Sequence, residues 1–124
     1  MIIGVGTDIV QVERIKKAVI STKSFKEKAF TKNEIRYFDI KNNNYETIAG
    51  VFAAKEAISK ALGTGFRGFG LRDIEIKHDE LNKPIACLSD KIIKKFNMAH
   101  YCLHVSISHT NSEAIAFVVL EGGE

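Results

Sequence analysis

Alternating apolar and polar positions predict strands at both ends of the chain. Residues 2–10 repeat with period two, which places two glycines and Asp8 on one face and larger, mostly apolar side chains on the other. Residues 101–108 alternate in the same way near the C-terminal end. Residues 113–121 are apolar almost throughout, so we expect that strand to be covered on both faces, one of them by a partner subunit.

Helical patterns fill the region that follows the first strand. Residues 12–30 are predicted to be helical and cationic, with six basic and two acidic side chains. A capping box, Thr31-Lys32-Asn33-Glu34, begins a short helix that runs to about Ile40. Residues 45–62 stop at Gly63, which is a typical helix end, and they are predicted to form the longest helix of the chain.

Two further strands and one short helix complete the predicted elements. The strands, residues 73–78 and 84–88, flank a polar turn, and Ser89 is positioned to cap a helix that extends through Phe96. The length of 124 residues is close to the ~150 residues of an average domain, so residues 1–124 are predicted to form a single domain. A composition of 45% hydrophobic and 27% charged residues is typical of globular proteins and excludes a disordered chain.

Net charge and hydropathy narrow the possible partners. The chain carries 18 basic and 15 acidic residues, and a net charge of +3 is too mild to indicate nucleic-acid binding. Its longest apolar runs, such as residues 114–120, fall far short of the ~20 residues that cross a bilayer, so no membrane association is expected. No signal peptide is evident at the N-terminal end. Cys87 and Cys102 lack the pattern of a disulfide framework and are interpreted as buried thiols, in agreement with an expected cytoplasmic location.

A stripe along the longest predicted helix combines apolar and charged side chains. Ile48, Phe52, Glu56 and Lys60 follow one another at intervals of four residues. Glu56 and Lys60 can be interpreted as a surface pair worth ~0.3 kcal/mol. Three alanines in the same helix would also let a ligand or another backbone approach closely, which favours a functional site instead.

Asp8 presents a similar choice. An acid inside an apolar strand must be solvated, paired or bound to a metal to avoid a large desolvation cost, so a structural hydrogen-bonding role stays open. If Asp8 and Glu56 converge, their two carboxylates suit Mg²⁺, which keeps several waters and binds substrate phosphates.

Two other segments could contact phosphate. Residues 63–68 spell G-x-G-x-x-G, but they follow a helix and precede a strand, the reverse of the dinucleotide-binding order, so that function is rejected. They form either a helix cap and connector or a backbone surface close to a phosphate or a pantetheine arm. His109 ends a predicted strand at a polar turn, where its imidazole and the neighbouring hydroxyls either serve the turn or hold a phosphate. The four histidines show no zinc-binding spacing, so no zinc site is expected.

Three motifs resemble one family when they are taken together. They are GVGTDIV at residues 4–10, FAAKEAISKALGTG at residues 52–65 and SISHT at residues 106–110, with Arg14 after the first. In this order and within this length they resemble the holo-[acyl-carrier-protein] synthases, the half-length type of the phosphopantetheinyl transferase family. The resemblance spans nearly the whole chain and implies an α+β fold, with a small antiparallel sheet packed against a long central helix and shorter helices.

The same resemblance implies an activity and a set of site residues. The implied enzyme transfers 4'-phosphopantetheine from coenzyme A to a serine of apo acyl carrier protein and releases adenosine 3',5'-bisphosphate, in support of fatty acid biosynthesis. Asp8 and Glu56 would bind Mg²⁺ and Lys60 would contact the reacting phosphate, which makes these three the implied catalytic set. The proton acceptor for the serine stays open between Glu56, Asp8 and a metal-bound water. The residues implied to bind coenzyme A are Lys41, Lys60, Gly63, Pro84, His109 and Thr110.

The resemblance also implies partners. Arg14 and Lys17 would dock the acidic carrier protein, and the local excess of positive charge is an independent reason for that attraction, with a plainly solvated basic helix as the alternative. Family members are trimers with active sites between neighbouring subunits. The sequence departs from the family pattern at Val51, where relatives often carry a basic residue that helps to hold phosphate. Either Lys55 or Arg67 compensates, or nucleotide affinity is weaker.

A second function of a different class is also open. The chain could be a non-catalytic coenzyme A or nucleotide-binding protein that uses its basic helix as an interaction surface. The combination of Asp8, Glu56 and Lys60 disfavours this alternative, because simple binding does not require paired carboxylates beside a diphosphate.

Overall fold

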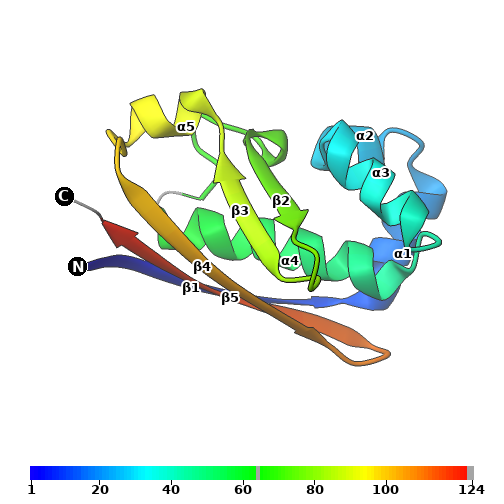
Figure 1. The fold of residues 1–124 in the computed structure, drawn as a ribbon. Helices are drawn as coiled ribbons and strands as arrows, with labels where there is room; N and C mark the ends of the chain where they lie inside the picture. The colour runs from blue at the N-terminus through cyan, green and yellow to red at the C-terminus, as the bar shows by residue number, and fades with distance from the viewer. Residues whose placement is uncertain (64, 123–124) are drawn as a thin grey trace.

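Helices and strands are interleaved in an α+β fold, the class that the sequence indicates (Figure 1). A computed structural model describes residues 1–63 and 65–122. The elements in chain order are β1 (Ile2–Gln11), α1 (Val12–Ser21), α2 (Phe25–Ala29), α3 (Lys32–Ile40), α4 (Tyr45–Ala61), the 3-10 helix η1 (Leu71–Asp73), β2 (Ile74–His78), β3 (Pro84–Leu88), α5 (Asp90–Lys95), β4 (Tyr101–His109) and β5 (Glu113–Gly122). None of the helices in these described ranges is long and apolar enough to span a membrane.

The central helix α4 packs between two antiparallel sheets. β5 lies in the middle of a three-stranded sheet, with β1 on one side and β4 on the other. The register pairs Asp8 of β1 with Ala116 of β5, and Ala116 with Ile107 of β4. β2 and β3 form a separate pair on the other side of α4 (Figure 1). The predicted packing of a small antiparallel sheet against a long helix is therefore confirmed.

Gly4 and Gly6 allow β1 to lie directly against α4. A β-carbon added at Gly4 would overlap the carbonyl oxygen of Ala61, and one added at Gly6 would overlap the carbonyl oxygen of Ala57. Only glycine fits where two backbones approach this closely. The glycine face of β1, which also carries Asp8, is therefore the face that meets α4.

Capping residues set the ends of α3 and α4, and the sequence predicts those at Thr31 and Gly63. The Thr31 hydroxyl accepts a hydrogen bond from the Glu34 amide at 3.2 Å, and the Glu34 carboxylate accepts one from the Thr31 amide at 2.8 Å. Asn44 caps α4 by accepting from the Glu46 amide at 2.8 Å. After α4, Gly63 has a φ of +86°, a left-handed conformation that favours glycine at a helix end.

The predicted cationic helix over residues 12–30 is interrupted. Thr22 leaves α1 in an extended conformation, and the Phe25 amide donates to the Thr22 carbonyl at 3.0 Å before α2 begins. The ring of Phe25 then packs edge-on against Phe30, with 6.1 Å between centroids, and also against Phe52 of α4. Burial of this aromatic group turns the chain, and the basic residues are divided between α1 and α2.

Two smaller predictions are wrong. Ser89 occupies the position before α5, but its hydroxyl donates to Asp73 Oδ1 at 2.9 Å instead of capping the helix. The cysteines are not both buried, because Cys87 is half-buried and Cys102 is exposed. Cys102 lies on the face of β4 that points away from α4, where a single chain provides no cover.

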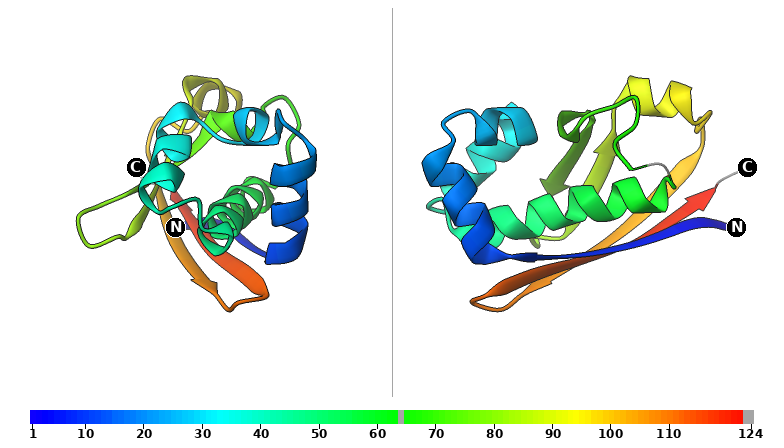
Figure 2. Two further views of the ribbon diagram at one scale, coloured as in Figure 1. Left: turned by 90° about the vertical axis from the view of Figure 1, so that its right-hand side faces the viewer. Right: turned by 180° about the vertical axis from the view of Figure 1, so that it is seen from behind.

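The outer face of the three-stranded sheet is apolar and open. Its exposed apolar residues are 44% to 59% accessible and comprise Ile3, Val5, Ile9, Ile115 and Phe117. The opposite face of β5 is buried under α4 through Ala114, Ala116, Val118 and Leu120. No helix or strand of the described chain covers the outer face (Figure 2). Cover for the second face of β5 would have to come from outside this chain.

Candidate active site

Asp8 and Glu56 open into one surface hollow. β1 directs Asp8 toward α4, and Glu56 lies on the side of α4 that faces the junction of β1 with α1. Arg14 of α1 and Phe52 of α4 line the same hollow. The convergence of the two carboxylates, which the sequence left conditional, is therefore present in the fold.

Lys60 joins this group through Asp8. Its Nζ atom donates to Asp8 Oδ1 at 3.1 Å and to the Thr7 carbonyl at 2.9 Å. The pKa of Glu56 is raised by burial and further by the negative charge of Asp8, while the positive charge of Lys60 lowers it in part. The charges of Asp8, Glu56 and Lys60 thus influence one another. Lys60 pairs with Asp8 of β1 and not with Glu56, its neighbour on α4.

The chemistry of this donor set fits a magnesium ion. Asp8 and Glu56 supply two hard oxygen ligands from different elements, and the hollow leaves room for waters and phosphate oxygens. Burial and, to a smaller extent, the nearby Asp8 carboxylate raise the pKa of Glu56, and a divalent cation would relieve the repulsion between the two carboxylates. Among the described residues, those that line this hollow offer oxygen ligands and no sulfur or imidazole ligand.

A second cavity lies on the other side of α4 and contains Pro84 and His109. Glu46, Val51 and His78 are among its further lining residues. His109 Nδ1 lies 3.1 Å from Glu46 Oε2, which orients the imidazole at the end of β4. The cavity therefore combines a contact between histidine and glutamate with an apolar wall.

Tyr37 and His78 form an aromatic wall of this cavity that sequence patterns do not reveal. Their rings stack with 4.0 Å between centroids and an interplanar angle of 5°. Lys41 is placed nearby, with Nζ 5.7 Å from the Tyr37 ring centroid. The Nδ1 atom of His78 is buried and has no hydrogen-bond partner in the described chain. No short motif joins Tyr37 to His78, so only the tertiary fold could show this wall.

Thr110 and Gly63 occupy different surroundings from His109. The Thr110 hydroxyl accepts hydrogen bonds from the amides of Ser112 and Glu113 at 3.2 and 3.1 Å, so in this chain it serves the turn between β4 and β5. Gly63 follows the C-terminal end of α4, whereas Glu46 beside His109 lies in the first turn of that helix. The predicted coenzyme A set is thus not gathered in one place within a single chain. Thr64 of the glycine-rich motif lies outside the described residues.

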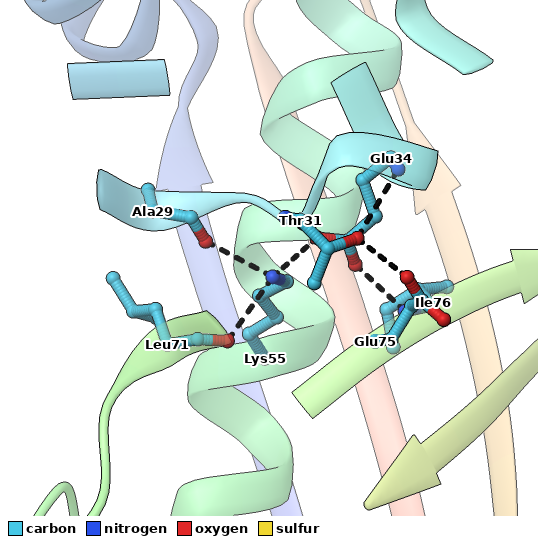
Figure 3. Close-up of polar contacts among 7 residues, drawn as sticks. All are labelled: Ala29, Thr31, Glu34, Lys55, Leu71, Glu75 and Ile76. Atoms are coloured by element: carbon cyan, nitrogen blue, oxygen red, sulfur yellow. Dashed lines mark hydrogen bonds and ion pairs between the residues drawn. The ribbon is translucent and has the colours of Figure 1, made fainter. Parts of the chain in front are cut away.

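Lys55 is not available to compensate for Val51. Its side chain is fully buried, and Nζ lies 2.5 Å from Glu34 Oε1 while donating to the carbonyls of Ala29 at 2.9 Å and Leu71 at 3.1 Å (Figure 3). Burial lowers the pKa of Lys55, and the charge of Glu34 opposes that effect. This amine holds α4 to its neighbours. Of the sequence-based explanations for Val51, compensation by Lys55 is excluded, whereas compensation by Arg67 and weaker nucleotide affinity stay open.

Arg14 and Lys17 are both exposed on α1, but only Arg14 reaches the carboxylate hollow. The helix therefore presents positive charge directly beside Asp8 and Glu56. This position is compatible with a carrier-protein surface, although Lys17 lines none of the hollows described above.

The two groups of predicted site residues lie at opposite edges of the sheet. Asp8 belongs to the edge strand β1 and His109 to the other edge strand β4, with β5 between them. The hollow that contains Asp8 shares no lining residue with the cavity that contains His109, within the described ranges. α4 packs across the sheet (Figure 2), and the two hollows open on different sides of this helix.

Comparisons with known proteins agree with the fold. The model of the "4'-phosphopantetheinyl transferase superfamily" matches residues 4–118. A holo-[acyl-carrier-protein] synthase from Clostridium botulinum strain Eklund 17B is 58% identical over 121 residues, which cover 98% of each chain. The crystal structure of Helicobacter pylori holo-[acyl-carrier-protein] synthase in complex with coenzyme A has a TM-score of 0.84 and 38% identity, covering 94% of this chain and 99% of that one. A Bacillus anthracis holo-(acyl-carrier-protein) synthase structure has a TM-score of 0.81 and 37% identity, covering 99% of both chains.

The fold, the paired carboxylates and these similarities define the class of the protein. The chain belongs to the 4'-phosphopantetheinyl transferase superfamily. Within that class it is similar over nearly its full length to holo-[acyl-carrier-protein] synthases.

Proposed function

We propose that this chain transfers 4'-phosphopantetheine from coenzyme A to a serine of apo acyl carrier protein, in support of fatty acid biosynthesis. The serine oxygen forms a bond to the pantetheine-side phosphorus of the diphosphate, the bond from that phosphorus to the bridging oxygen breaks, and adenosine 3',5'-bisphosphate leaves. The serine proton passes to a base. The observation that carries this proposal is that Asp8 and Glu56 line one open hollow and Lys60 pairs with Asp8, in a chain similar to a synthase crystallised with coenzyme A.

Magnesium is the proposed cofactor, held by Asp8 and Glu56. When bound, the ion would neutralise charge on the diphosphate as the bond to the leaving nucleotide lengthens. Lys60, whose amine already lies 3.1 Å from Asp8, would place a further positive charge against the same phosphate oxygens. Both effects act where negative charge develops, which is why the three residues are proposed as the catalytic set.

The nucleotide part of coenzyme A is assigned to the second cavity. His109, with Thr110 beside it, would contact phosphate, and Pro84 would contribute apolar lining. Lys41 would add positive charge near the ring of Tyr37, which lines the same cavity as Val51. Gly63, at the far end of α4, would contact the ligand from the carboxylate side.

A complete site then requires two copies of the chain, and we propose a homotrimer. One copy would supply Asp8, Glu56 and Lys60 from its β1 edge, and a neighbour would supply His109 from its β4 edge. The open apolar face of the sheet supports this assembly, because burial of Val5, Phe117 and similar side chains against another copy is favourable. A trimer mass in solution is the expected result of light scattering.

Subunit complementation tests the shared site directly. Glu56→Gln and His109→Ala chains should each be inactive or nearly so as pure proteins. In co-expressed mixed trimers, about a quarter of the sites would combine an intact Glu56 with an intact His109 from the neighbour, so activity should return. A site formed within one chain would leave the mixture as inactive as its components, and that outcome would reject the split site.

The transfer itself is tested by mass spectrometry. Apo carrier protein should gain one phosphopantetheine mass when coenzyme A, Mg²⁺ and this protein are present, and the gain should disappear when a chelator removes Mg²⁺. Glu56→Gln should abolish turnover with the fold intact, because the amide removes the charge of a metal ligand, whereas Glu80→Gln, in an exposed turn, should not. Coenzyme A binding without any mass gain would support the alternative, a non-catalytic binding protein.

Carrier docking at Arg14 and Lys17 is the proposed role of α1. Arg14→Glu should raise the KM for carrier protein more than the KM for coenzyme A. The substitution replaces a positive with a negative charge on the surface that is proposed to bind the acidic carrier protein. Lys94→Glu makes the same charge change on exposed α5 and should leave both constants unchanged. Equal effects of Arg14→Glu on both substrates would argue against docking.

The proposed location is the cytoplasm. Both cysteines are free thiols, as is usual for proteins in a reducing compartment. Cell fractionation followed by immunodetection tests this location.

A further inference from the structure

Three side chains of different chemistry meet on the outer face of the sheet, away from α4. Cys102 of β4 is paired in register with Glu121 of β5, and His104 lies two residues further along β4 on the same face. The thiol sulfur, an imidazole nitrogen and a carboxylate oxygen all lie within 4.8 Å of one another. In Figure 1 this end of the sheet lies where β1 begins and β5 ends, remote from the turn between β4 and β5 that follows His109.

The spacing of these atoms is close to that of a metal-binding site. Zinc bonds of about 2.0–2.3 Å to sulfur, nitrogen and oxygen place tetrahedral ligand atoms roughly 3.3–3.8 Å apart. His104 Nε2 and Glu121 Oε1 are already 3.0 Å apart. Cys102 and His104 are exposed in the single chain, so side-chain rotation could bring the sulfur closer without moving the strands. In the proposed trimer, the site would lie on the sheet face that packs against other copies.

The donor types discriminate between metals. Thiolate, imidazole and carboxylate are the three protein ligands that zinc uses, whereas Mg²⁺ prefers oxygen ligands alone. His100 lines the same surface hollow as Cys102 and Glu121, so an additional imidazole or a water is at hand for a fourth position.

We propose that Cys102, His104 and Glu121 form a second metal site, specific for Zn²⁺ and separate from the carboxylate site of Asp8 and Glu56. It would tie β4 to β5 at the end of the sheet, close to the exposed Ile3 of β1. The sequence-based expectation of no zinc site considered spacing along the chain, and it missed this cluster because Glu121 approaches only through strand pairing. The site does not depend on the proposed transferase activity.

Calorimetric titration of the full-length native protein with Zn²⁺ tests the site, with saturating Mg²⁺ present to occupy the oxygen ligands. Wild type should bind up to one Zn²⁺ per chain, and removal of a ligand by Cys102→Ser or His104→Gln should weaken binding by at least about 10-fold. Cys87→Ser is the matched control, because it removes the other free thiol and should bind like wild type. Equal affinity of wild type and Cys102→Ser, or no binding to either, would overturn the proposal.

Cobalt substitution and thermal unfolding provide readouts that do not depend on activity. Co²⁺ should give a sulfur-to-metal charge-transfer band in wild type and Cys87→Ser that is absent in Cys102→Ser. Zn²⁺ should raise the Tm of wild type and Cys87→Ser but not of Cys102→Ser, since a ligand stabilises only the state that binds it. Circular dichroism without metal checks that every variant is folded. A Tm shift retained in Cys102→Ser would count against these ligands.

Discussion

The amine of Lys60 lies 3.1 Å from the carboxylate of Asp8 and bridges to the Thr7 carbonyl at 2.9 Å. The side chain of Lys60 is 55% exposed, and an ion pair this open to solvent contributes little to stability. A functional role explains its position beside two carboxylates better, because a diphosphate that enters the hollow would meet the positive charge of Lys60. Lys60 therefore links α4 to β1 at the point where we place the reaction.

Replacement of Lys60 should separate catalysis from folding. Lys60→Met is expected to lower kcat by about 100-fold or more, because one preorganised positive charge at the developing phosphate charge is lost. Lys60→Arg should restore part of the rate, since it keeps the charge but changes the donor geometry. Steady-state kinetics with apo carrier protein measures both effects, with Lys94→Met on α5 as the exposed control. A wild-type kcat for Lys60→Met would remove this residue from the catalytic set.

Gly6→Ala should be destabilising, because its new β-carbon would overlap the backbone oxygen of Ala57. Backbone atoms cannot rotate away as a side chain can, so we expect a loss of about 1–3 kcal/mol or more in the free energy of unfolding. Urea denaturation measures that loss. Gly70→Ala is the matched control, because no atom lies within 4 Å of an added β-carbon there. Similar midpoints for the two variants would show that β1 can move away from α4 at little cost.

Local signals explain which parts of the fold could be predicted from the sequence. The capping box at Thr31 and the glycine after α4 act over a few residues, and both are found where predicted. The period-two pattern of β1 likewise separated the Asp8 face from the apolar face. By contrast, the break after α1 depends on Phe25 reaching Phe30 and Phe52, which is a tertiary contact.

The candidate site shows the same division. Helical spacing grouped Glu56 with Lys60, and chemical reasoning about a strand carboxylate singled out Asp8. Neither could show that Lys60 pairs with Asp8, because two elements far apart in sequence must first pack together. The stacking of Tyr37 on His78 and the placing of Glu121 beside Cys102 also arise only when distant segments pair.

The buried pair of Lys55 and Glu34 should be sensitive to removal of either charge alone. Lys55→Met leaves the Glu34 carboxylate, which is 1% exposed, without its cation, and it should cost about 3–5 kcal/mol of unfolding free energy. Adding Glu34→Gln should cost less than the sum of the two single changes, because the uncompensated charge is then gone. Lys77→Met is the surface control. Its amine lies 3.9 Å from Glu75 and is 56% exposed, so the loss should stay below about 1 kcal/mol. A small effect of Lys55→Met in urea denaturation would contradict this role.

His78 should make stability depend on pH. Burial lowers its pKa below the usual 6.5, the positive charge of Lys41 lowers it further, and Asp79 opposes both. As pH falls through 6.5, the unfolded chain takes up a proton that the folded chain resists, so the free energy of unfolding should decrease. The contribution of neutral His78 to the free energy of unfolding is fully present above about pH 6.5. The change of that free energy with pH that one group can cause does not exceed about 1.4 kcal/mol per pH unit.

His78→Phe isolates this contribution, because a phenyl ring can keep the stack on Tyr37 but cannot be protonated. Between about pH 8 and about pH 5, its free energy of unfolding should decrease less steeply than that of wild type. Urea denaturation at a fixed protein concentration at each pH measures the two curves, and His100→Gln, which changes an exposed histidine, should follow wild type. Carboxylate protonation affects all three proteins alike, so the difference between curves reports His78. Parallel curves for wild type and His78→Phe would mean that His78 is protonated as readily in the folded chain as in the unfolded one.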